Sequence, residues 1–241
     1  MEKHPAQAVF ANVVGSKNIA DMAYKYKAEK FVMVSTDKAV NPSNVMGASK
    51  RIAEIYIQAL QEKLKTDNKI TTQYVTTRFG NVLGSNGSVV PLFKKQIEEG
   101  GPLTITHPDI IRYFMTIPEA CQLVIEAGAM GNGGEVFIFD MGEAVKIIDL
   151  AKKIIRLAGF TPYKEIDIKV IGLRPGEKLY EELLNDNCQT LPTYNEKIMI
   201  AKIESYDYAS INKLILDLAD IAKEGTKNEI VLKIKDIVPE F

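Results

Sequence analysis

Cysteine and histidine are scarce in this chain of 241 residues, which contains two of each: Cys121, Cys188, His4 and His107. Their positions form neither a disulfide framework nor the CxxC or HExxH spacing of a zinc site built by the protein. We therefore expect a protein of a reducing compartment that binds no metal ion.

An excess of charge and long apolar runs are also missing. The 30 Lys and Arg residues nearly balance the 31 Asp and Glu residues, for a net charge of −1. The composition therefore favours neither nucleic acid nor an anionic membrane as a partner. No apolar run approaches the ~20 residues of a membrane-spanning helix, and the first residues lack the pattern of a signal peptide. We expect a soluble chain in the cytoplasm.

The glycine motif of dinucleotide-binding folds is absent as well. No G-x-G-x-x-G stands between a predicted strand and a predicted helix, and the glycines within residues 131–134 precede a strand with the wrong spacing. The chain opens directly on a predicted helix. The segment that holds the phosphates of the cofactor in such a fold is therefore missing from this sequence.

Predicted helices and strands alternate along the chain. Apolar residues recur at helical spacing over residues 6–26 and 43–64, and short, partly β-branched runs predict strands at residues 30–36 and 70–83. This order is typical of a parallel sheet covered by helices. Further helices are predicted at residues 117–130, 146–159 and 177–184 and in the tail after residue 206. Further strands are predicted at residues 135–142 and 166–173. Residues 84–110 are predicted to form connections and a small subdomain.

Polar residues with proton-transfer chemistry follow the strand predicted at residues 30–36. Ligands of open α/β sheets bind at the carboxyl ends of the strands, where Thr36, Asp37 and Lys38 offer a hydroxyl, a carboxyl and an amine. A lysine with an unperturbed pKa of about 10.4 is a poor proton acceptor at neutral pH. Lys38 therefore needs a desolvated pocket or a cationic neighbour.

The next predicted helix places Met46 and Lys50 on one face, four residues apart. Lys50 can supply a second positive charge or hold a ligand, and Gly47 leaves space for a cofactor. An amphipathic helix with Met46 in the core and Lys50 in solvent fits the same spacing, so both interpretations stay open.

Five segments, taken together, resemble the polysaccharide-biosynthesis branch of the extended short-chain dehydrogenases/reductases. They are "STDKAVNPSNVMGASKRIAE", "RFGNVLGSNGSVVPLF", "THPDIIRYFMTIPEACQLV", "FDMGEAVKIIDLAKKII" and "GLRPGEKLYEELL". The group that they most resemble is the large, membrane-attached UDP-N-acetylglucosamine 4,6-dehydratases. That branch carries Met-x-x-x-Lys where the superfamily carries Tyr-x-x-x-Lys, and the pair here is Met46 and Lys50.

The resemblance implies a catalytic set of five residues: Thr36, Asp37, Lys38, Met46 and Lys50. It implies that Thr36 and Asp37 lie near the hexose, that Asp37 donates a proton to the departing 6-hydroxyl, and that Lys38 removes the C5 proton. Lys50 holds the nicotinamide ribose. Because a thioether cannot accept a proton, Met46 marks the subgroup. The acceptor of the 4-hydroxyl proton stays open between Thr36 with Asp37 and a chain of waters.

The same resemblance implies two binding sets. For NAD it implies Asn12, Ser35, Lys50, Arg78 and Phe79, and for the UDP-sugar Asn81, Ser88, Val89, Arg112, Arg174 and Glu177. Arginine suits a diphosphate through its bidentate fork, and a carboxylate suits paired ribose hydroxyls. From the residues alone, surface ion pairs for Arg112 and Arg174 and an ordinary polar loop around Ser88 stay open.

We expect an α/β fold with a partial Rossmann-like parallel sheet, whose first βα units are missing, and a smaller α/β substrate-binding subdomain. Residues 1–83 and 111–141 form the remaining NAD-binding part in this prediction, and residues 84–110 and 142–241 the UDP-sugar-binding part. The resemblance implies a longer parent protein. Its upstream segment holds most of the NAD and attaches the protein to the membrane, and the parent forms a homo-oligomer.

The leading hypothesis is the catalytic C-terminal portion of a UDP-N-acetylhexosamine 4,6-dehydratase, which uses NAD to make a 4-keto-6-deoxy sugar for surface polysaccharide. Two alternatives stay open. One is a 4-epimerase or a C5-inverting dehydratase on the same scaffold, and the other is a non-catalytic fragment that binds nucleotide sugars.

Because the phosphate-binding motif is absent, we predict that this chain alone binds NAD weakly and does not turn over substrate. Isothermal titration of the purified 241-residue chain should show no binding at micromolar NAD. The parent protein, titrated in the same buffer, is the positive control. A micromolar dissociation constant for the chain alone would contradict this prediction.

Overall fold

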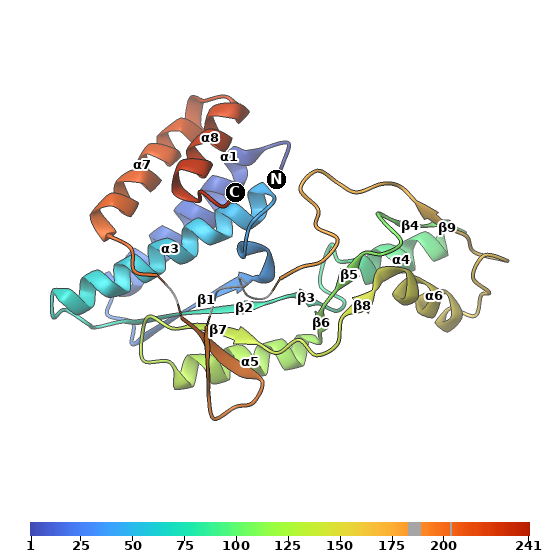
Figure 1. The fold of residues 1–241 in the computed structure, drawn as a ribbon, viewed down its shortest axis with the longest axis horizontal. Helices are drawn as coiled ribbons and strands as arrows, with labels where there is room; N and C mark the ends of the chain where they lie inside the picture. Colours follow the sequence, from blue (N-terminus) through green and yellow to red (C-terminus); the bar gives the residue numbers. More distant parts are fainter. Residues whose placement is uncertain (183–188, 203) are drawn as a thin grey trace. The chain divides into compact units, whose positions relative to one another are not determined.

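The computed structural model describes residues 1–182, 189–202 and 204–241, which form two compact units (Figure 1). The first unit comprises Met1–Phe79, Leu123–Asp140 and Glu182–Phe241, and the second comprises Gly80–Gln122 and Met141–Glu181. The division predicted from the sequence keeps residues 142–241 together, whereas the structure groups Glu182–Phe241 with the first unit. The reason is that this segment extends the sheet of the first unit and packs on its central helix.

A five-stranded sheet forms the centre of the first unit. Its order is β1 (Lys30–Thr36), β2 (Gln73–Phe79), β7 (Val136–Phe139), β11 (Ile198–Ala201) and β10 (Thr190–Pro192). The first three strands are parallel, which confirms the predicted Rossmann-like sheet, whereas β11 is antiparallel to β7 and β10 antiparallel to β11. Thr36 lies opposite Phe79, so β1 and β2 end at the same edge of the sheet.

Helices cover both faces of this sheet. α3 (Val45–Thr66) lies on one face, and the last part of α5 (Ile117–Met130) lies on the other (Figure 1). α3 is buried nearly all round, since the sheet covers one side and the C-terminal helices α7 (Tyr208–Glu224) and α8 (Lys227–Ile237) cover the other. The predicted first helix is confirmed as three consecutive segments, α1 (Pro5–Ala8), the π-helical turn η1 (Val9–Val14) and α2 (Gly15–Lys25).

The second unit holds three short two-stranded sheets and two helices. The pairs are β3 (Asn81–Val82) with β6 (Phe114–Met115), β4 (Leu103–Ile105) with β9 (Ile168–Val170), and β5 (Ile111–Arg112) with β8 (Val145–Lys146), and the helices are α4 (Val89–Glu98) and α6 (Ile147–Leu157). Phe93 of α4, Leu103 of β4 and Ile155 of α6 are fully buried in one apolar cluster. This cluster gives the unit a core of its own.

The helix predicted at residues 177–184 does not form over residues 177–182, and residues 183–184 lie outside the described part of the chain. Gly176 adopts a φ of +71°, a left-handed conformation that favours glycine. The carbonyls of Lys178 and Leu179 accept hydrogen bonds from the Arg112 side chain. These carbonyls are therefore not paired in a helix, and a tertiary contact overrides the apolar periodicity.

A buried ion pair fixes α3 to the sheet. Glu54 of α3 is 0 % exposed, and its carboxylate accepts a 2.8 Å hydrogen bond from Nε of Arg78 on β2, with a second contact to the terminal nitrogen of the same arginine. Arg51, one turn earlier, lies 3.3 Å from the same carboxylate and donates a 2.9 Å hydrogen bond to the Tyr206 hydroxyl. A buried carboxylate is stable only with such partners, so these contacts determine how α3 sits on β2.

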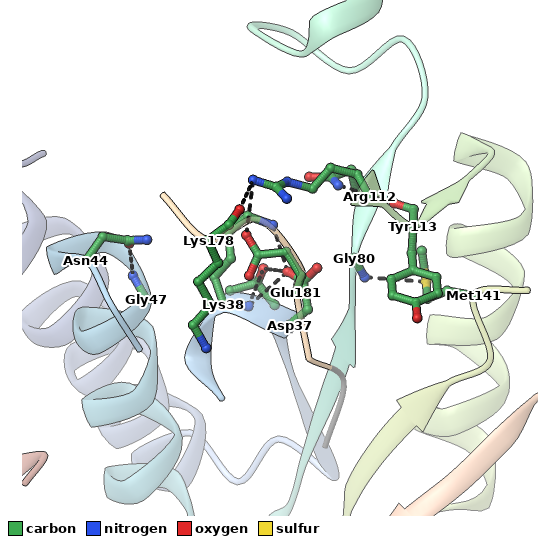
Figure 2. A network of polar contacts seen from close by, with 12 residues as sticks. Asp37, Lys38, Asn44, Gly47, Gly80, Arg112, Tyr113, Met141, Lys178 and Glu181 are labelled. Atoms are coloured by element: carbon green, nitrogen blue, oxygen red, sulfur yellow. Dashed lines mark hydrogen bonds and ion pairs between the residues drawn. The ribbon is translucent and has the colours of Figure 1, made fainter. Parts of the chain in front are cut away.

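Gly47 allows the first turn of α3 to approach the end of β1. A Cβ atom at this position would lie 2.1 Å from the Lys38 carbonyl oxygen and 3.2 Å from Cβ of Pro42. Asn44 caps the same turn, and its side chain accepts a 2.9 Å hydrogen bond from the Gly47 N–H (Figure 2). The glycine thus makes room for the backbone of Lys38, which the sequence alone does not indicate.

Among the residues that the structure describes, no helix combines the length and the hydropathy needed to cross a membrane.

We predict that Glu54→Gln lowers the free energy of unfolding at pH 7 by about 3 kcal/mol or more, because it leaves two arginines without their buried counter-charge. Burial alone would raise the pKa of Glu54, but Arg78 and Arg51 hold this pKa below its ordinary value of 4.5. The folded state therefore favours the ionised carboxylate, and its contribution is complete above pH 4.5 and is lost as the pH falls further. Urea unfolding should show a wild-type advantage that shrinks below this pH. Glu62→Gln, at an exposed position of α3, is the control, and an equal loss in both variants would contradict the prediction.

We also predict that Gly47→Ala destabilises the chain by about 1–3 kcal/mol, despite the better helix propensity of alanine, since the new methyl group collides with a backbone carbonyl. Gly15→Ala is the matched control, because its Cβ would meet no atom closer than 3.4 Å. Thermal unfolding of both variants measures the difference. A Gly47→Ala protein as stable as the Gly15→Ala protein would show that the turn does not need glycine.

Candidate active site

Asp37 is enclosed at the end of β1, in the short helix η2 (Asp37–Ala39), and is 1 % exposed. Its Oδ1 accepts 2.8 Å hydrogen bonds from the Thr36 hydroxyl and the Lys38 backbone N–H, and lies 2.8 Å from Nζ of Lys38. The predicted acid and base are therefore in direct contact (Figure 2), and one buried carboxylate oxygen of the acid, Oδ2, has no hydrogen-bond partner among the described residues.

Lys50 is half-buried near the same strand. Its Nζ donates a 3.2 Å hydrogen bond to the Val34 carbonyl of β1. Burial lowers the pKa of Lys50, and the nearby charge of Glu54 opposes this shift. Met46, one turn earlier, is also half-buried. The structure thus brings Lys50 to the strand that carries the predicted acid and base, rather than leaving it in solvent.

Asn12 lies in the π-helical turn η1 and contacts α3. Its side-chain amide donates a 2.9 Å hydrogen bond to Oγ of Ser49, whose hydroxyl donates to the Met46 carbonyl at 2.8 Å. A π-helical turn adds a residue to the helix and redirects the side chains within it, and such turns are frequent at functional sites. The contact places Asn12 next to the residue that precedes Lys50.

Three residues that the resemblance assigns to the cofactor are buried in the first unit. Ser35 and Arg78 lie opposite each other in the β1–β2 register; the Arg78 side chain bonds to Glu54, and the Ser35 hydroxyl is buried without a hydrogen-bond partner among the described residues. Phe79 stacks on Phe139, with ring centroids 5.4 Å apart. The expectation that Arg78 binds NAD gains no support, because the buried charge of Glu54 already holds its guanidinium.

The glycine-rich turn of the second unit joins β3 to α4. Gly84 and Gly87 adopt φ values of +77° and +74°, so the turn requires glycine at both positions. Ser88 precedes α4, which begins with Val89, and the Ser88 Oγ is buried without a partner among the described residues. Asn81 donates a 3.2 Å hydrogen bond from its side chain to a backbone carbonyl. Asn81 in β3 and Ser88 before α4 thus flank the glycine-rich turn, and their predicted contact with a diphosphate stays a prediction.

The structure also brings Arg112 and Glu177 together. Arg112 is 8 % exposed, and its terminal nitrogen lies 3.5 Å from Glu177 and 3.7 Å from Glu181. The second oxygen of Glu177 accepts a 3.0 Å hydrogen bond from the backbone N–H of Arg174, whose side chain is exposed. The interpretation of Arg112 as a surface ion pair is therefore wrong, since the residue is buried inside a network (Figure 2).

Glu54 and Glu181 are two charged members of these networks that the set predicted from the sequence does not include. Glu54 follows Lys50 by four residues on the same helix, and this spacing could have identified it as a neighbour of the site. Glu181 lies in a segment whose periodicity predicts a helix, and no local signal connects it with Arg112.

The groups around Lys50 fit the nicotinamide end of NAD. They combine a half-buried cation of lowered pKa with the polar side chains of Asn12 and Ser49. Residues 1–182, 189–202 and 204–241 contain no cluster of three or more His, Cys, Asp or Glu side chains that could hold a metal ion.

Comparison with known proteins identifies relatives of this chain. It is 56 % identical to the capsular polysaccharide biosynthesis protein CapD of Staphylococcus aureus, over 90 % of this chain and 35 % of that protein. It is 51 % identical to the "Probable polysaccharide biosynthesis protein EpsC" of Bacillus subtilis, over 92 % of this chain and 36 % of the relative. A UDP-glucose 4-epimerase of Rickettsia canadensis is 39 % identical over 76 % of this chain and 52 % of the relative. The chain thus spans about a third of the length of the first two relatives.

A solved structure and a family model agree with these relatives. The X-ray structure of Pen from Bacillus thuringiensis matches with a TM-score of 0.74 and 33 % identity, over 90 % of this chain and 70 % of that chain. The family model described as "Polysaccharide biosynthesis protein" matches residues 1–203. The chain therefore belongs to the polysaccharide biosynthesis protein family.

Proposed function

We propose that this chain is the catalytic portion of a nucleotide-sugar 4,6-dehydratase, which converts UDP-N-acetylglucosamine or a similar UDP-N-acetylhexosamine to a 4-keto-6-deoxy sugar for surface polysaccharide. The observation that carries the proposal is the contact between Asp37 and Lys38 at the end of β1. Elimination of water from adjacent carbons needs an acid and a base side by side. Membership in the polysaccharide biosynthesis family supports nucleotide-sugar chemistry of the dehydratase or epimerase type.

The Asp37–Lys38 ion pair holds the proton that this elimination needs. Because Oδ1 and Nζ are 2.8 Å apart, a proton shift converts the ion pair into a carboxylic acid and a neutral amine. Lys38 then removes the proton from C5, and Asp37 gives its proton to the departing 6-hydroxyl, which leaves as water. Lys38 later returns a proton to C5. Thr36 orients the acid through its hydrogen bond to Oδ1.

If bound, NAD would supply the redox chemistry by taking hydride from C4 of the sugar and returning it to C6, while the proton of the 4-hydroxyl would pass to Thr36 with Asp37 or to a chain of waters. The C4 ketone acidifies the adjacent C5–H, which makes an amine an adequate base. Lys50 holds the nicotinamide ribose in this proposal, and Asn12 supports Lys50 through Ser49. In this proposal, the upstream segment of the parent protein binds the phosphates of NAD.

The second unit supplies the groups for UDP. Arg112 and Arg174 offer guanidinium groups for the diphosphate, and Glu177 offers a carboxylate for the ribose hydroxyls. Ser88 and Val89 lie at the start of α4, where backbone N–H groups favour an anion, and Asn81 lies in β3, before the glycine-rich turn. These assignments follow the family resemblance.

A 4-epimerase is the second candidate, because the Rickettsia relative carries that name. Epimerisation at C4 needs a proton acceptor for the 4-hydroxyl but no acid for a leaving group. The enclosed acid Asp37, paired with Lys38, therefore favours dehydration. A C5-inverting dehydratase uses the same pair and differs only in the face on which C5 is reprotonated.

The parent protein is proposed to act as a homo-oligomer on the cytoplasmic side of the membrane, to which its upstream segment attaches it. Nucleotide sugars and NAD are the small-molecule partners in this proposal, and no nucleic acid is involved.

Incubation of the parent protein with NAD and UDP-N-acetylglucosamine, followed by NMR of the product, tests the function. We predict a UDP-linked 4-keto-6-deoxy sugar with the gluco configuration retained at C5. Inversion at C5 would favour the inverting dehydratase. A product that differs from the substrate only in configuration at C4 would contradict dehydration and support the epimerase.

A further inference from the structure

Thr106 follows the last residue of β4 and contacts a carboxylate from the segment after β9. β4 and β9 pair in parallel, with Ile105 opposite Val170, so the chain leaves both strands at the same edge. The Thr106 hydroxyl donates a 3.1 Å hydrogen bond to one oxygen of Glu177. Both residues belong to the second unit, so the contact depends on the fold of that unit alone.

Both oxygens of the Glu177 carboxylate have partners. Oε1 accepts the hydrogen bond from Thr106 and lies 3.5 Å from a terminal nitrogen of Arg112. Oε2 accepts a 3.0 Å hydrogen bond from the Arg174 backbone N–H. A carboxylate has about four lone pairs in total, so these three contacts leave one lone pair, on Oε2. The side chain is 21 % exposed, so a ligand can reach this position.

The Thr106 oxygen can act only as an acceptor toward a ligand. A threonine hydroxyl has one hydrogen and two lone pairs. The hydrogen is used on Glu177, and no described residue donates a hydrogen bond to the oxygen. Thr106 is half-buried rather than enclosed. The Thr106 oxygen and Oε2 of Glu177 therefore offer two acceptors on residues that are bonded to each other.

Two neighbouring acceptors suit a ligand that brings two neighbouring hydroxyl donors. The 2′- and 3′-hydroxyls of a ribose are such a pair, whereas a 2′-deoxyribose has only one of them. An acceptor that loses its donor away from water costs free energy. A site that pairs with a hydroxyl of its substrate therefore rejects the analogue that lacks this hydroxyl.

We propose that Thr106 is a specificity residue that fixes the carboxylate of Glu177 and, together with it, selects ribonucleotides over 2′-deoxyribonucleotides. This inference rests on the proposed function, which assigns Glu177 to the ribose hydroxyls of UDP. It adds a residue to that site and a reason why the sugar of the nucleotide is a ribose.

A hydrogen bond that only braces the segment after β9 makes a different prediction. Loss of such a brace loosens Arg174 and Glu177 for every nucleotide, so UDP and 2′-deoxy-UDP lose affinity alike. Loss of the acceptor pair weakens the binding of UDP more than that of 2′-deoxy-UDP. The ratio of the two affinities therefore separates the two roles of Thr106.

The test is NMR titration of the full 241-residue chain with UDP and with 2′-deoxy-UDP. We expect the wild type to bind UDP about tenfold more tightly than 2′-deoxy-UDP, or better. Thr106→Val removes the hydroxyl at nearly the same shape, so this preference should fall to about threefold or less. Thr106→Ser keeps a hydroxyl and should keep the wild-type preference.

Thr104→Val is the matched control, because it removes a hydroxyl of the same strand that accepts a 2.7 Å hydrogen bond from Gln96 and does not contact Glu177. It should leave the preference for UDP unchanged. Circular dichroism verifies the folding of each variant, and Thr106→Ala repeats the measurement if the valine variant is unstable.

The outcomes separate this inference from the proposed function. A wild-type preference that persists without the Thr106 hydroxyl overturns the inference and leaves the UDP site standing. Equal losses for UDP and 2′-deoxy-UDP overturn it as well, as does a serine variant that behaves like the valine variant. A wild-type chain that binds both nucleotides equally overturns the inference alone. Absence of UDP binding to the wild-type chain overturns both the inference and the proposed UDP site.

Discussion

The buried carboxylate of Glu54 is the interaction on which the first unit depends. It is fully enclosed between α3 and β2, where an unpaired charge would be prohibitively costly, so it requires the guanidinium of Arg78 and the support of Arg51. Once this contact fixes α3 on the sheet, the first turn of the helix meets the Lys38 backbone at Gly47, and Lys50 reaches the Val34 carbonyl. The packing of α3 on the sheet therefore brings Lys50 to β1 and the first turn of α3 to the backbone of Lys38, next to Asp37.

Much of this unit could be predicted from the sequence, because its elements follow simple periodicities. The strand at residues 30–36 and the helix at residues 117–130 have the predicted bounds. The hairpin of β10 and β11 was not predicted, since its strands are three and four residues long and carry little pattern. The failed helix at residues 177–182 has another cause. Its carbonyls bond to a side chain more than 60 residues away, and no local periodicity reports such a contact.

The candidate site shows the same limit. Asp37 and Lys38 are adjacent in the sequence, so their contact follows from the strand end and could be predicted. Arg78 could not be placed, because an arginine at a strand end suits a phosphate as well as a buried carboxylate. Its partner lies 24 residues earlier in the chain. The Glu54 carboxylate is buried and binds Arg78, and a single sequence does not reveal that Glu54 is buried. A contact between adjacent residues is thus easier to predict from the sequence than the distant ion-pair partner of an arginine side chain.

We propose that Lys38, paired with Asp37, moves the C5 proton of a UDP-sugar. Deuterium incorporation at C5 tests this role most directly, when the parent protein and its Lys38→Met variant act on UDP-N-acetylglucosamine in heavy water. We expect deuterium at C5 of the wild-type product. We also expect neither product nor exchange with the variant, although UDP binding persists. Normal turnover with deuterium at C5 in the Lys38→Met variant would contradict this role.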